Sequence, residues 1–221
     1  MRRVMAVCVA AAGAAGVVAA QGTYVPQRVY DAARGAFADF EVMLADVATA
    51  NVPRPLASEI SKGGLGVLDG KTGETRQLFA RELVCPTDDD YFRRFVEAMG
   101  DHPGEGTSTV AEKREATERF YFAQCVKDET MAESIADAYR AAAAAGPRPL
   151  AVHVNGAFHS DFGAGTAART IRRLPGARVV VVTVVPVANL DALSPAESER
   201  ARAHYLVYTI RLKAPGAPAG E

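Results

Sequence analysis

The residues best suited to chemistry lie in one loop, NGAFHSDFG, at positions 155–163. The loop follows the apolar run 150–154, which predicts a buried strand, and a helix is predicted to begin near Gly165. Its histidine, His159, can ligate a metal or a haem iron, or act as a base. The Asn and Asp of the same loop could orient the imidazole or contact a ligand. Because α/β folds bind ligands where strands end and helices begin, the loop predicts a ligand site.

A long helix predicted from about residue 110 to 145 places polar side chains on an otherwise apolar face. The face is formed, at helical spacing, by Phe120, Gln124, Asp128, Met131 and Ile135. Buried polar groups require hydrogen-bond partners. The amide and the carboxylate therefore either line a pocket or hold a neighbouring loop, and the pattern alone leaves both interpretations open.

Other chemical motifs narrow the choice of function. The sequence has no GxSxG, P-loop, dinucleotide-binding or HExxH motif, so the enzyme classes that use them are not indicated. His153 lies within the predicted strand, where a structural role is expected. The chain carries 25 Lys and Arg against 26 Asp and Glu, and this balance does not point to nucleic acid or to an anionic membrane surface.

The predicted fold is α/β, with a small, mostly parallel sheet, flanking helices and a helix-rich N-terminal half. Three apolar runs, 150–154, 178–186 and 205–210, alternate with helical segments through short connections. The spacing of Phe37, Phe40, Leu44 and Val47 predicts a further helix over residues 37–49. Ser194 and Pro195 predict the cap and first residue of another helix.

The N-terminus has the pattern of a signal peptide. Arg2 and Arg3 precede an uncharged Ala- and Val-rich run, and small residues stand before Gln21. We therefore expect residues 1–20 to be a signal peptide, residues 21–212 a single domain and residues 213–221 a disordered tail. In an oxidising compartment Cys85 and Cys125 would form a disulfide or remain two buried thiols, and the sequence leaves both open.

Several stretches together resemble one known family. The segments FAQCVKDETMA (residues 122–132) and NGAFHSDFG (155–163) are similar, in order and spacing, to the ChaN-like haem-binding uptake proteins of the Tiki/TraB superfamily. RRLPG (172–176) and the Val-rich run after it fit the same pattern, as does NVPR (51–54). The resemblance covers roughly residues 50 to 210.

The resemblance implies an exported protein of the periplasm or outer membrane that takes part in haem binding and iron uptake. It also allows association with the envelope and a homodimer. Haem would be the cofactor, and its matching residues are Arg54, Gln124, Asp128, Asn155 and His159. His159 is the candidate metal ligand, and Tyr121 is the other candidate for the axial position. No catalytic residue is implied.

The chain departs from the family before residue 51. Family members carry there a strand ending in a Gly-Glu-x-His motif, then a helix and a second acidic strand motif, and this sequence has neither. An internal deletion would account for this, and it would leave the pocket incomplete. A metal-dependent hydrolase of the wider superfamily, and a degenerate paralogue without a ligand, are the alternative functions.

Overall fold

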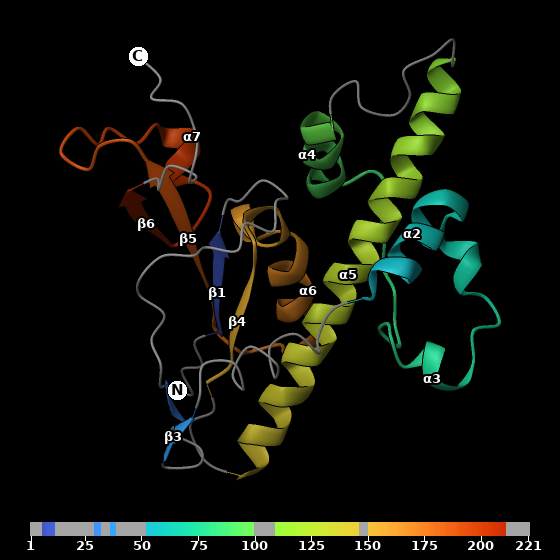
Figure 1. Cartoon of the computed structure of the whole chain (residues 1–221), viewed down its shortest axis with the longest axis horizontal. Helices are drawn as coiled ribbons and strands as arrows, with labels where there is room; N and C mark the ends of the chain where they lie inside the picture. The colour runs from blue at the N-terminus through green and yellow to red at the C-terminus, as the bar shows by residue number, and fades with distance from the viewer. Residues whose placement is uncertain are drawn as a thin grey trace.

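The computed structural model describes residues 52–99, 109–145 and 150–210, together with the backbone of three short strands nearer the N-terminus. These strands are β1 (Ala6–Ala11), β2 (Val29–Asp31) and β3 (Ala36–Ala38). Strands and helices alternate in the C-terminal half, and longer helices precede them (Figure 1). The predicted α/β class is therefore confirmed.

The main sheet is parallel and has four strands in the order β4-β1-β5-β6. β4 (Val152–Gly156), β5 (Val179–Val187) and β6 (Tyr205–Ile210) are the three strands that the apolar runs predicted. β2 and β3 form a separate antiparallel pair. β5 lies inside the sheet, and its Val-rich sequence is buried at most positions, as expected for an inner parallel strand.

β1 falls within the predicted signal peptide. Its backbone pairs with β4 on one side and with β5 on the other, so Val9 stands between Val154 and Val182. We expected residues 1–20 to lie outside the domain, yet six of them form an inner strand. The reason is physical: an Ala- and Val-rich run suits both a signal sequence and a buried strand. Cleavage of residues 1–20 remains a prediction, and it would remove the strand between β4 and β5.

Most of the described helical residues precede β4. The helices before β4 are α2 (Arg54–Gly63), the 3-10 turn η1 (Leu65–Leu68), α3 (Gly73–Arg76), α4 (Asp90–Met99) and α5 (Val110–Ala145). Those after it are the 3-10 turns η2 (Ala157–His159) and η3 (Asp161–Gly163), then α6 (Gly165–Arg173) and α7 (Glu197–Arg200). None of the described helices is long and apolar enough to cross a membrane.

Two predicted helices differ from the structure. Phe37 lies in β3, where it pairs with Tyr30, and residues 39–49 lie outside the described part of the chain. The predicted start at Pro195 is also wrong, since α7 begins at Glu197 and its N-cap is Ala196. The predicted tail, residues 213–221, is likewise outside the described ranges.

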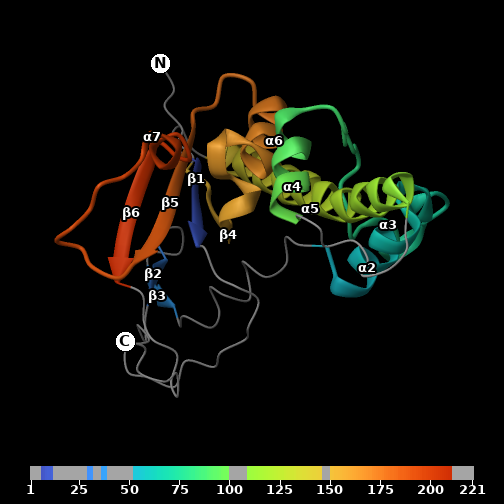
Figure 2. The same ribbon diagram turned by 90° about the horizontal axis from the view of Figure 1, so that it is seen from above.

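α5 is the central element because it packs on both sides. Ala123 and Val126 face α2 in one apolar cluster, whereas Tyr121 and Cys125 face α4 in a second. α6 packs along the middle of α5 on the side away from α2, and the views in Figures 1 and 2 agree on this. The helix is therefore buried on most sides around its middle turns, and polar residues there must find partners inside the protein.

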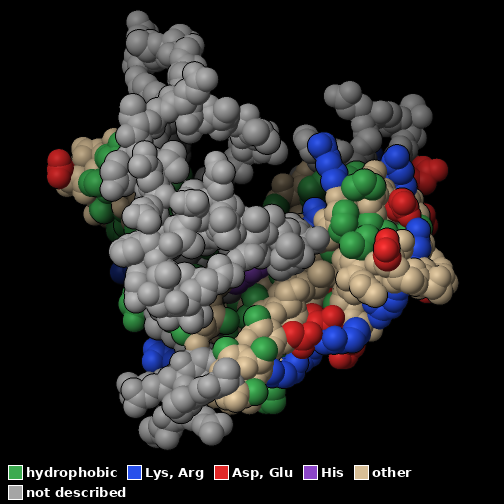
Figure 3. Space-filling view, turned by 60° about the horizontal axis from the view of Figure 1, so that its bottom comes forward, with side chains coloured by type: hydrophobic (Ala, Val, Ile, Leu, Met, Phe, Trp, Pro, Cys, Tyr) green, Lys and Arg blue, Asp and Glu red, His purple; other side chains and the backbone are tan. Residues whose placement is uncertain are grey.

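The face of the described residues that Figure 3 shows carries both positive and negative side chains. In Figure 3, Lys and Arg side chains lie intermixed with Asp and Glu side chains on this face. Ion pairs such as Arg81–Asp137, at 2.7 Å, and Arg114–Glu118, at 3.1 Å, join them. This mixing agrees with the net charge of −1 in the whole sequence.

Candidate functional site

Asp128 forms the centre of a buried polar cluster on α5. Its carboxylate is 0% exposed and meets three different side chains. Oδ2 accepts a hydrogen bond from the Tyr91 hydroxyl at 2.6 Å, and Oδ1 accepts one from the Thr166 hydroxyl at 2.8 Å. Oδ1 also lies 2.7 Å from Nδ1 of His159. α4, η2 and α6 thus converge on one carboxylate of α5.

The contact with Asp128 assigns the roles of the two imidazole nitrogens of His159. A carboxylate can only accept, so Nδ1 carries a hydrogen and Nε2 of a neutral ring has a lone pair. The side-chain amide nitrogen of Gln124 lies 2.8 Å from Nδ1 and 3.3 Å from Nε2, and it can donate only to Nε2. A histidine held through Nδ1 by a carboxylate is the arrangement that orients Nε2 towards a metal. The side chain of His159 is 19% exposed.

Tyr91 reaches Asp128 because α4 begins at the right place. Asp89 caps α4, and its carboxylate accepts the backbone N–H of Phe92 at 2.7 Å. Burial raises the pKa of Tyr91, and the nearby Asp128 carboxylate and its hydrogen bond raise it further. The hydroxyl therefore stays protonated and acts as a donor to Asp128.

A disulfide joins the segment before α4 to α5. Cys85 and Cys125 have an S–S distance of 2.05 Å and a Cα–Cα distance of 5.8 Å. The sequence left open a disulfide or two buried thiols, and the structure contains the disulfide. Cys125 lies next to Gln124 along α5, and Cys85 precedes Tyr91 by six positions. The bond therefore holds the two sides of the polar cluster together.

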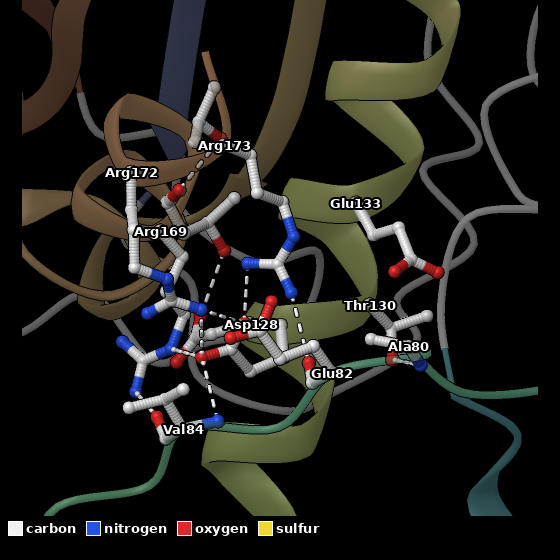
Figure 4. Close-up of polar contacts among 12 residues, drawn as sticks. Ala80, Glu82, Val84, Asp128, Thr130, Glu133, Arg169, Arg172 and Arg173 are labelled. Carbon is white, nitrogen blue, oxygen red and sulfur yellow. Dashed lines mark hydrogen bonds and ion pairs between the residues drawn. The ribbon is translucent and has the colours of Figure 1, made fainter. Parts of the chain in front are cut away.

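Glu129, the next residue of α5, meets a different environment. It is also 0% exposed, but its partners are three arginines of α6. Its Oε1 accepts from Arg169 Nε at 3.1 Å, and its two oxygens accept from Arg172 Nη2 at 2.8 and 2.7 Å. Arg173 Nη1 lies 2.5 Å from Oε2 of Glu129, and this contact is an ion pair that does not have the geometry of a hydrogen bond. Figure 4 shows the three guanidinium groups turned towards α5, with Glu82 and Val84 alongside.

The loop that carries His159 is held from several directions. Asn155 accepts the hydroxyl of Ser160 at 3.1 Å, and its buried Nδ2 has no partner among the described residues. Gly165 adopts φ +50°, and a Cβ there would lie 2.4 Å from the carbonyl oxygen of His159. A glycine is needed at this position, because α6 begins in contact with the backbone of the histidine it follows.

Asp161 anchors the second part of the loop. Its Oδ1 accepts the Thr183 hydroxyl of β5 at 2.8 Å, and its Oδ2 accepts Arg202 Nε at 2.7 Å. The next residue, Phe162, has φ 62° and ψ 17°, the only positive φ outside glycine in the described backbone. Its N–H donates to the Arg202 carbonyl at 2.6 Å. Asp161 therefore fixes the loop to the sheet. The sequence suggested that it could orient the imidazole, but its two oxygens are bonded to Thr183 and Arg202 instead.

Four of the five predicted haem-site residues meet around the start of α6. Gln124, Asp128 and His159 form one network, and Asn155, near the end of β4, accepts a hydrogen bond from Ser160, the residue after the histidine. Arg54 is the exception: it is exposed at the start of α2, and no polar contact joins it to another described residue. α2 packs on the opposite side of α5, so the helix itself separates this arginine from the histidine.

Two further positions differ from the prediction. Tyr121, the second candidate for an axial ligand, is 0% exposed and packed against the rings of Phe92 and Phe95. Burial raises its pKa to about 12, so its hydroxyl is a poor ligand for iron. Phe120 was expected on the buried stripe of α5, but it is 44% exposed, whereas its neighbour Tyr121 takes the buried position against α4.

His153 is a structural histidine, as the sequence indicated. Val152 and Val154 are exposed on one side of β4, and the imidazole points to the other, with Nε2 3.3 Å from Met131 Sδ. Burial lowers the pKa of His153, and the nearby His159 lowers it further, while Asp128 acts in the opposite direction.

Sequence reasoning missed Tyr91 and Thr166 as members of the cluster. Neither residue was among the candidate site residues, although Thr166 follows the predicted helix start near Gly165. A signal existed for the threonine, since it follows the loop and stands in the first turn of α6. Nothing local marked Tyr91, because its partner is 37 positions away. No group of three or more His, Cys, Asp or Glu side chains within the described residues is placed to hold a metal ion.

Comparison with known proteins identifies the family. The family model described as "Haem-binding uptake, Tiki superfamily, ChaN" matches residues 42–170, more than half of the chain. The chain belongs to this family. No curated protein matches this ChaN-family chain. Among solved structures it is similar to ChaN of Campylobacter jejuni, described as showing cofacial haem binding, with a TM-score of 0.41 and 14% identity. The match covers 71% of this chain and 48% of that one, so the chain spans about half the length of its relative.

Proposed function

We propose that this ChaN-family chain is an exported haem-binding protein related to iron uptake, with His159 as the iron ligand. The observation that carries the proposal is the buried Asp128 carboxylate, which lies 2.7 Å from Nδ1 of His159 and leaves Nε2 with the lone pair. Haem, when bound, would supply an iron that accepts a nitrogen donor. The family name supports haem as the group concerned.

The residues present suit a planar, largely apolar group. Phe158 precedes His159 and packs against the rings of Tyr91 and Phe95, at centroid distances of 5.2 and 5.9 Å. An aromatic wall of this kind gives a flat ligand contact area and excludes water from its iron. Gln124 donates towards Nε2 at 3.3 Å, so the amide must turn away when an iron takes that lone pair.

Export is supported by two independent features. Arg2 and Arg3 with the uncharged run after them have the pattern of a signal peptide. The Cys85–Cys125 disulfide belongs to an oxidising compartment, such as the bacterial periplasm. We infer that the protein acts in the periplasm or at the outer membrane, where a haem-uptake protein meets its ligand.

The proposed site is smaller than the family's. Arg54 is exposed on the far side of α5, and the segment before residue 51 lacks the Gly-Glu-x-His motif. The remaining donors are therefore those of the loop and of α5. We infer that haem is held by fewer polar groups than in a complete family member, and that its affinity is correspondingly lower.

A haem titration followed at the Soret band tests the proposal. Wild-type protein should shift the band, and His159→Ala should abolish the shift. His204→Ala is the matched control, because His204 accepts the backbone N–H of Val181 at 3.0 Å and lies outside the cluster. This control should bind haem as the wild type does.

Three other outcomes would change the assignment. Absence of a Soret shift in the wild type would refute haem binding. An equal shift in wild type and His159→Ala would move the iron ligand to another residue. Metal-stimulated hydrolysis that His159→Ala abolishes would favour the hydrolase of the wider superfamily instead.

A further inference from the structure

A second feature adjoins the aromatic wall formed by Phe158 and Tyr91. A cavity of about 380 Å³ opens between α4 and the loop before α6. It is lined by Tyr91, Phe158 and Phe162, together with Arg94, Glu97, Ala98 and Asp161. Its volume falls within the range of small-molecule sites. His159 is not among its lining residues, but Tyr91, which donates to Asp128, and Phe158, which precedes His159, line the cavity and adjoin the cluster.

Arg94 gives the cavity a cation. The guanidinium carbon lies 3.6 Å from the centroid of the Phe162 ring, so the group stacks on the ring. Arg94 has no ion pair or hydrogen bond with any other residue in the described ranges, whereas its neighbour Arg93 pairs with Asp90. A guanidinium stacked on an aromatic face keeps its N–H edge free for a carboxylate.

The carboxylates at the cavity do not neutralise this cation. Both oxygens of Asp161 are engaged, one by Thr183 and the other by Arg202. Glu97 is exposed one helical turn beyond Arg94 and forms no ion pair with it. The free cation is therefore available to an anionic group that enters from solvent.

Phe162 is held in place at a cost in backbone strain. A left-handed conformation is unfavourable for a residue with a side chain, and glycine would adopt it freely. The conformation persists because Asp161 fixes the loop to β5 and the Phe162 N–H bonds to Arg202. Such strain is found where a side chain must point in a set direction. The strained conformation keeps the ring of Phe162, which is 38% exposed, in the lining of the cavity beside Arg94.

We propose that this cavity binds the edge of a planar aromatic carboxylate, with Arg94 pairing with the carboxylate and Phe162 contacting the ring system. The inference rests on the proposed function, since haem is such a ligand, and it names the residues that select for the carboxylate. Arg94 is on this view a specificity residue and has no part in binding the iron.

Iron-free protoporphyrin is the decisive probe, because it has the ring and both carboxylates but cannot use His159. Its binding is followed by fluorescence, with its dimethyl ester as the uncharged comparison. Wild-type protein should bind the free acid about tenfold more tightly than the ester, the difference expected from a charge-assisted hydrogen bond. Arg94→Gln should remove this difference by weakening only the free acid.

Matched variants separate charge from ring contact. Arg93→Gln removes a neighbouring α4 cation that is already paired, and it should leave both affinities unchanged. Glu97→Gln should strengthen binding of the free acid about twofold, since it removes a negative charge beside Arg94. Phe162→Gly should weaken both probes several-fold without lowering the melting temperature, because glycine relieves the left-handed strain.

The inference fails if the wild type binds neither probe, if it binds both equally, or if Arg94→Gln and Arg93→Gln behave alike. These outcomes differ from a failure of the proposed function, which appears as a missing Soret shift with haem or as insensitivity to His159→Ala. Protoporphyrin binding that depends on Arg94, in a protein without a His159-dependent Soret shift, would uphold the cavity and refute the iron ligand.

Discussion

Asp128 and Glu129 are neighbours on α5, both 0% exposed, and yet they have opposite surroundings. Asp128 accepts hydrogen bonds from two hydroxyls and lies against a histidine, and it also interacts with the charge of Arg169. Glu129 meets three arginines, with oxygen–nitrogen distances of 2.5 to 3.1 Å. The first carboxylate is bonded directly by neutral hydroxyls and an imidazole, and the second is paired directly with three guanidinium groups.

The difference indicates that the two carboxylates serve different purposes. An acid paired with several guanidinium groups fixes elements in space, because none of its partners titrates near neutral pH. Burial lowers the pKa of Arg169, but the charges of Asp128 and Glu129 raise it more, so this arginine stays charged. The Glu129 region therefore joins α5 to α6, and the Asp128 region orients a histidine whose Nε2 can bind a ligand.

The largest effect should come from Glu129→Gln. This change leaves three arginines without their shared counter-charge, and breaking a buried ion pair costs about 4 kcal/mol. Thermal unfolding should show a melting temperature lower by more than ten degrees. A loss equal to that of an exposed acid such as Glu115→Gln would show that Glu129 is not a structural clamp.

Asp128→Asn should cost less in stability but more in function. Its partners are mainly hydroxyls, of which one can still donate to the amide oxygen while the other must accept from the amide NH2, so we expect about 2 kcal/mol of destabilisation. Haem binding should weaken strongly, since Nδ1 of His159 loses its orienting carboxylate. If Asp128→Asn and Glu129→Gln show the same ratio of stability loss to affinity loss, the contrast between the two regions is wrong.

Tyr91→Phe sharpens the comparison within the Asp128 region. It removes a donor that lies 2.6 Å from Oδ2 but leaves the ring in place, and it should cost about 1.5 kcal/mol. Tyr121→Phe is the comparison, because the Tyr121 hydroxyl makes no hydrogen bond of good geometry with a described residue and lies only near Arg169, so its loss should cost less than that of the Tyr91 hydroxyl. Chemical denaturation of both variants gives the difference directly.

The smallest effect is a pH dependence confined to the Asp128 side. Burial lowers the pKa of His153 below its ordinary value of 6.5, so the unfolded chain takes up the proton first as the pH falls. The stability contributed by the neutral ring is present above pH 6.5 and decreases below it, by at most about 1.4 kcal/mol per pH unit. His153→Gln should flatten the difference between unfolding curves at pH 7 and pH 5. An unchanged pH dependence would show that the ring is not held neutral.

Local patterns predicted much of the fold. β4, β5 and β6 follow from apolar runs bounded by turn residues, and α5 from its helical spacing, because these signals lie within one element. β1 was not recognised as a strand, since six Ala- and Val-rich residues fit a signal peptide equally well. The wrong start of α7 arose because Pro195 also suits the extended segment before a helix.

The sequence by itself determined which residues are available: a histidine in a loop after a strand, an amide and two acids in the middle of a long helix, and two cysteines. It also determined the family, through the order and spacing of those segments. Only the tertiary structure decided their pairing. It placed Tyr91 and Thr166 on Asp128, gave the arginines to Glu129, and left Arg54 on the far side of α5. The physical reason is that helical spacing sets which face a residue occupies, whereas its partner depends on which distant element packs against that face.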